Sequence, residues 1–69
     1  METKEKRILA AFSASRKLKS ITPSEGQIDN IIFRLQQIFT TEELSRMEEK
    51  DFMRQVERVW PIAKYIDRN

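Results

Sequence analysis

The fold is decided by residues 22–39, which read TPSEGQIDNIIFRLQQIF. The segment opens with a capping box, in which Thr22 is the N-cap, Pro23 is the first helical residue and Glu25 is the third. Its apolar residues then recur every three or four positions, and on a helix they fall within an arc of about 120°. These residues are Ile28, Ile31, Ile32, Leu35, Ile38 and Phe39. The pattern predicts a helix over 23–39 whose apolar stripe must be covered by flanking segments or by a partner.

Two more helices are predicted around this one. Residues 4–19 place Ile8, Phe12 and Leu18 on one face, so they predict a helix that covers the stripe from one side. After Phe39, Thr40 and Glu43 have the capping-box spacing and predict a short helix over 41–49.

The last predicted helix covers 51–67, with Asp51 as its N-cap. Its apolar face keeps its phase through Pro61, although proline removes a backbone donor and clashes with the preceding turn, so we expect a kink or break near Pro61. The residues on this face are Phe52, Val56, Val59, Trp60, Ala63 and Ile66. No stretch alternates with a period of two for long. The sequence therefore predicts a single all-α domain over 1–69, a small bundle of three to four short helices.

Composition limits the chemistry of this domain. A chain of 69 residues buries only about 60% of the surface that its unfolded form exposes, so its core is small. It contains no Cys and no His, which removes disulfides, thiolate nucleophiles, the commonest general base and the commonest transition-metal ligand. Glu48, Glu49 and Asp51 lack the spacing of a calcium loop. We expect no enzyme activity, no metal and no cofactor.

The charges are unevenly distributed. Residues 1–20 carry six basic and two acidic groups, residues 21–53 three basic and seven acidic, and residues 54–69 four basic and two acidic. The segments can attract one another, or the basic start can face an anionic partner. The longest apolar runs have four or five residues, which predicts no membrane span, and the absence of Cys fits a cytoplasmic protein.

Phe33 is the main candidate for contact with a partner. It lies off the apolar stripe of its helix, among small or polar residues that include Asn30 and Gln37. An aromatic residue in such surroundings can anchor a partner or a dimer interface. Tyr65 points away from the apolar face of the last helix and is a second candidate, whereas Trp60 is expected in the core. The alternative is that the helix over 23–39 is covered on both sides, which would place Phe33 in the core.

Basic residues give a second candidate site, for nucleic acid. They lie in the first predicted helix and in the last: Arg16, Lys17, Lys19, Arg54, Arg58, Lys64 and Arg68. Phosphate contacts need clustered Lys and Arg, yet on a helix over 4–19 the first three point in different directions, so solvated surface charge is the alternative. A helix-turn-helix is disfavoured, because the helix after the Thr40 corner is acidic.

We therefore expect a small cytoplasmic module that binds another protein as a regulator, inhibitor or adaptor, with a homodimer as one option. Nucleic-acid binding is the alternative function.

Overall fold

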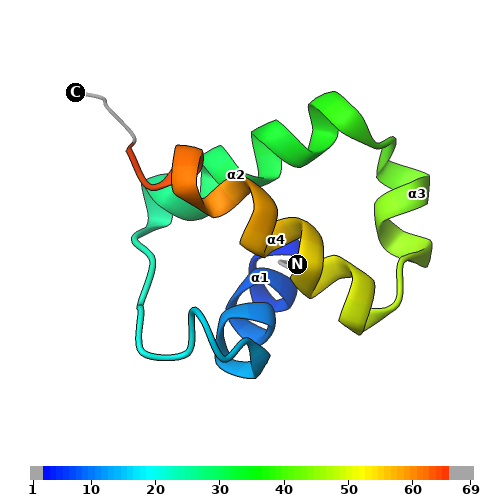
Figure 1. Ribbon diagram of the computed structural model, residues 1–69. Coiled ribbons are helices and arrows are strands. Elements are labelled where there is room, and N and C mark those ends of the chain that lie inside the picture. Colours follow the sequence, from blue (N-terminus) through cyan, green and yellow to red (C-terminus); the bar gives the residue numbers. More distant parts are fainter. Residues whose placement is uncertain (1–2, 66–69) are drawn as a thin grey trace.

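The computed structural model describes residues 3–65, which form four helices. They are α1 (Thr3–Ala14), α2 (Glu25–Ile38), α3 (Thr41–Arg46) and α4 (Glu49–Ala63). Figure 1 shows α4 crossing α1, with α2 along the other side of α4 and α3 set apart from the rest. No strand occurs between residues 3 and 65. The predicted all-α bundle of short helices is confirmed.

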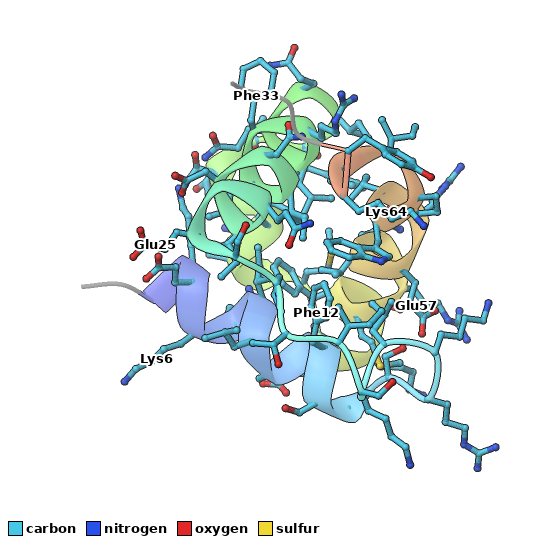
Figure 2. All side chains as sticks on the ribbon, turned by 90° about the vertical axis from the view of Figure 1, so that its left-hand side faces the viewer. Lys6, Phe12, Glu25, Phe33, Glu57 and Lys64 are labelled. Atoms are coloured by element: carbon cyan, nitrogen blue, oxygen red, sulfur yellow. The ribbon has the colours of Figure 1, made fainter. Side chains whose placement is uncertain are left out.

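The core lies where α4 packs against both α1 and α2. The buried apolar residues are Ile8, Ala11, Phe12, Leu18, Ile28, Ile31, Leu35, Leu44, Phe52, Val56, Val59, Trp60 and Ala63. Phe12 and Trp60 meet edge to face, with ring centroids 5.0 Å apart and an interplanar angle of 89°. Figure 2 shows Phe12 between the helices, in the middle of the bundle. Trp60 is a core residue, as predicted, while Ile66 lies outside the described residues.

The first helix is shorter than predicted, since α1 ends at Ala14 and not at residue 19. The cause is Ser15, whose buried Oγ accepts hydrogen bonds from the backbone N–H groups of Lys17 and Leu18, both at 3.2 Å. A serine that satisfies backbone donors in this way competes with the helix and favours a turn. Leu18 therefore reaches the core from a turn.

The second helix begins two residues later than predicted. Its N-cap is Ser24 and not Thr22, and the reciprocal capping bonds join Ser24 and Gln27. Both spacings fit a capping box. With Ser24 as the cap, residues 21–23 stay outside the helix, where Pro23 is buried and Ile21 packs against the core.

The third and fourth helices also differ from the predictions at their ends. The Thr40–Glu43 capping box of α3 is confirmed, but α3 ends at Arg46, because Met47 and Glu48 are extended. The N-cap of α4 is Glu48, without a side-chain cap, and the predicted cap Asp51 lies in the first turn.

Pro61 does not begin a separate helix. The hydrogen bond from Lys64 N–H to the carbonyl of Trp60, at 2.9 Å, continues the ladder past it, and α4 runs unbroken to Ala63. Residues 66 and 67 of the predicted helix lie outside the described residues.

Candidate protein-binding groove

Three large apolar side chains of α2 and α4 remain on the surface and lie in the same place. Phe33 is 60% exposed, Ile38 60% and Ile62 56%. All three line a groove between the two helices, with a volume of about 410 Å³. Contiguous exposed apolar surface marks binding sites more often than single exposed residues do. This α2–α4 groove is therefore the candidate functional site.

The antiparallel packing of α2 and α4 builds the groove. At the start of α2, Asn30 Nδ2 donates to the carbonyl of Ala63 and Gln27 Nε2 to that of Lys64, both at 3.2 Å. The later turns of α2 therefore face the middle of α4. Residues three and four apart share one face of a helix, so each helix supplies one such set. Within the described part of the chain, the lining is Phe33, Arg34, Gln37, Ile38, Phe39, Gln55, Arg58, Val59 and Ile62.

The end of α2 leaves the groove uncovered. Phe39 is extended, with φ −124° and ψ 151°, and its N–H closes the helix on the carbonyl of Leu35 at 2.8 Å. The chain then turns at Thr40 into α3, which lies away from the last turns of α4 (Figure 1). Because α3 leaves in this direction, Ile38 stays exposed although it belongs to the predicted apolar stripe.

The groove is positively charged. Among the described residues, its lining contains Arg34 and Arg58 and no acidic side chain. Arg34 Nε is buried and has no hydrogen-bond acceptor among residues 3–65. Within residues 3–65, an ion pair joins Arg46 to Glu42 at 3.9 Å, but neither residue lines the groove. The lining thus combines apolar contact area with donors suited to a carboxylate.

The four predicted partner-binding residues lie in different places. Phe33 and Gln37 line the groove, and Figure 2 shows Phe33 at the edge of the molecule, pointing outward. Phe33 is thus not covered by a second layer. Asn30 is half-buried and holds the end of α4 through Ala63, and Tyr65 is 74% exposed outside the groove lining.

The predicted basic residues lie on the turn after α1 and on the outer face of α4. Arg16, Lys17 and Lys19 are exposed in that turn, so the argument that a helix scatters them does not apply. Ser15 Oγ donates to Glu57 Oε2 at 2.5 Å, which fixes the turn beside α4. On α4, Lys50, Arg54 and Arg58 follow one another at intervals of four residues and are exposed. Lys64 is also exposed, and Arg68 lies outside the described residues.

Phe33, Gln37 and Arg58 are the lining residues that the sequence offered as site candidates; the most prominent of the others are Ile38, Ile62 and Arg34. Ile38 was assigned to the core, because its position on the stripe does not reveal where α3 will go. Ile62 and Arg34 were not singled out. Ile62 could have been recognised from the sequence, because it lies next to Pro61 and outside the predicted buried face of the last helix.

Other kinds of site find no support in the described part of the chain. Between residues 3 and 65, no three His, Cys, Asp or Glu side chains gather in a way that could hold a metal ion. In the same range, no helix has the length and apolar character needed to cross a membrane. Comparisons with protein-family models, with curated proteins and with solved structures give no match.

Proposed function

We propose that this protein binds another protein through the α2–α4 groove and acts as a non-enzymatic regulator, inhibitor or adaptor. The observation that carries the proposal is that Phe33, Ile38 and Ile62 are more than half exposed and line one groove. The absence of Cys and His supports a role without catalysis, and the absence of Cys also fits the cytoplasm.

The apolar contacts alone would give modest affinity. Complete burial of one Ile or Phe side chain is worth about 1.5–3 kcal/mol, so covering the exposed part of these three yields roughly 3–5 kcal/mol. Association itself costs at least about 4 kcal/mol. The polar residues of the lining must therefore contribute, and the partner must be complementary to them.

The test is a photo-crosslinking amino acid placed at Gln37 in the full chain, in the cells that produce it. We expect covalent adducts with a distinct protein, and we expect Ile38→Glu in the same chain to abolish them. The matched control is the same amino acid at Gln36, which is also exposed but does not line the groove. Equal adducts at both positions, or adducts that survive Ile38→Glu, would refute the groove as the contact.

Nucleic-acid binding is the second candidate function. The observation in its favour is that the Ser15–Glu57 hydrogen bond ties the turn that carries Arg16 and Lys17 to α4, the helix that carries Arg54 and Arg58. With Lys19 these give five possible phosphate contacts, for which raising the salt from 50 to 200 mM would weaken binding about 500-fold.

A fluorescence-anisotropy titration of a labelled 20-base-pair duplex at both salt concentrations tests this second function. Arg16→Ala with Lys17→Ala removes two contacts and should reduce the salt effect to about 40-fold. The control is Lys4→Ala with Lys6→Ala, which makes the same charge change on α1. Absence of binding at 50 mM salt would rule the function out.

A further inference from the structure

We propose that the occupant of the α2–α4 groove is an acidic amphipathic helix from a different protein. This inference rests on the proposed function and goes on to specify the chemistry of the partner.

The walls of the groove favour a helical occupant. Both walls are helices, and residues 3–65 contain no strand whose edge could pair with an extended peptide. An extended segment would bring unpaired backbone N–H and C=O groups to a largely apolar lining, which offers few hydrogen-bond partners for them. A helix satisfies its backbone groups internally and lays an apolar face into such a groove.

The dimensions agree with this choice. The lining spans positions 33–39 of the α2 side and positions 55–62 of α4. At about 1.5 Å per residue, each wall is roughly 10–12 Å long, or about two turns of an α-helix. The occupant would then contribute apolar residues at positions i, i+3 or i+4, and i+7.

The charge of the lining specifies an acidic occupant. Arg34 and Arg58 bring positive charge to the groove, and none of the lining residues within 3–65 is acidic. Glu or Asp side chains beside the apolar face of the occupant would meet both guanidinium groups.

The same charges argue against a second copy of this chain. In a two-fold symmetric dimer each groove would face its own counterpart, so the arginines of both copies would gather in one interface. Such like-charge contacts cost several kcal/mol. The acidic part of the chain around α3 cannot serve as the occupant instead, because its apolar residues Leu44 and Phe52 are buried in its own core.

The experiment is a selection from displayed 16-residue peptides. Every peptide carries Leu at the three groove-facing positions, i, i+4 and i+7, on an alanine background, and six flanking positions vary among Glu, Lys and Gln. The full-length protein is the bait, together with Ile38→Glu, and with a charge-reversed bait that combines Arg34→Glu and Arg58→Glu. Circular dichroism and sedimentation first establish that each bait is folded and what its oligomeric state is.

We expect Glu to be enriched over Lys with the wild-type bait, Lys over Glu with the charge-reversed bait, and no enrichment with Ile38→Glu. For the best acidic peptide, Arg34→Gln with Arg58→Gln should weaken binding about 10-fold, as two partly exposed charge-assisted contacts would. The control, Arg16→Gln with Arg46→Gln, makes the same charge change away from the groove and should leave affinity unchanged.

Three results would overturn the inference. Peptides that depend on Ile38 but show no charge preference would leave the groove as a docking site and remove the acidic partner. If no peptide depends on Ile38 and Gln37 gives no specific crosslink, the proposed function fails as well. A wild-type dimer that Ile38→Glu converts to a monomer would identify a second copy as the occupant.

Discussion

Arg7 connects three helices, and its replacement gives the sharpest prediction for stability. From α1, Nη1 donates to the carbonyl of Leu44 at 2.7 Å and Nη2 to that of Met47 at 2.8 Å. These carbonyls lie at the end of α3, where intrahelical donors run out. The guanidinium carbon also lies 4.2 Å from the ring centroid of Phe52, near the start of α4. One side chain thus fixes α3 to the rest of the bundle.

The expected loss of unfolding free energy on replacing Arg7 follows from these contacts. A hydrogen bond from a charged donor contributes about 1.5–3 kcal/mol, and a cation–π contact about 0.5–2 kcal/mol. Because such terms are not additive, we expect Arg7→Ala to lower the free energy of unfolding by about 3 kcal/mol. A chain of this length has a total of roughly 3–10 kcal/mol, so the loss is a large fraction of it. In Arg7→Lys the charge persists but the fork that reaches both carbonyls is lost, and the expected loss is about 1–2 kcal/mol.

The assay is urea denaturation followed by Trp60 fluorescence and by circular dichroism. Lys6→Ala is the control: it removes the same charge from the neighbouring, exposed position and should change stability by less than about 0.5 kcal/mol. In a thermal melt, the loss in Arg7→Ala corresponds to a fall in Tm of about 12–24 °C. If Arg7→Ala unfolds within 0.5 kcal/mol of wild type, or if Arg7→Lys equals wild type, the connecting role assigned to Arg7 is wrong.

Three further changes test other parts of the fold by the same denaturation assay. Ser15→Ala removes the hydroxyl that organises the turn and binds Glu57, so we expect a loss of about 1–3 kcal/mol, and no loss would show that the turn forms without it. Ser24→Ala removes the N-cap of α2 and should cost about 1 kcal/mol, whereas the alternative cap Thr22→Ala should cost almost nothing. Ile31→Ala, at a fully buried position, should cost about 2–5 kcal/mol, while Ile38→Ala should cost less than about 1 kcal/mol; equal costs would contradict the exposed groove.

The helices could be predicted from the sequence where local signals were sufficient. The period of the apolar residues identified three of the four helices, and the Thr40 capping box identified α3 and located its start. Both signals depend on residues within one or two turns, so they do not require knowledge of the tertiary structure.

The helix ends were predicted less well, because neighbouring signals compete there. Thr22 with Glu25 and Ser24 with Gln27 have the same spacing, and the burial of Pro23 distinguishes them. Ser15 ends α1 through a turn that Glu57 supports from 42 residues away. A contact at that separation leaves no trace in a local pattern.

Only part of the candidate site could be predicted, because the rest of it also depends on contacts that are distant in the sequence. The position of Phe33 off the stripe follows from one helix, so it could be singled out, but the sequence left open whether it is exposed or covered. The exposure of Ile38 depends on the direction that the chain takes after α2, and it was not predicted. The role of Arg7 could not be predicted from any local pattern, because it donates to backbone carbonyls at the end of α3 that are 37 and 40 residues away.

The signals that place α3 also create the groove. The extended Phe39 and the Thr40 cap turn the chain away from α4, and Leu44 and Arg7 then hold α3 in its new position. The hydrogen bonds of Arg7, Leu44 and Thr40 involve neither Ile38 nor Ile62, whereas Phe39 lines the groove together with both. The open face is thus maintained by hydrogen bonds that substitutions at Ile38 or Ile62 leave intact. A loss of binding in Ile38→Glu with unchanged unfolding would therefore report on the groove itself, and a loss of stability in that variant would show that the groove is part of the core.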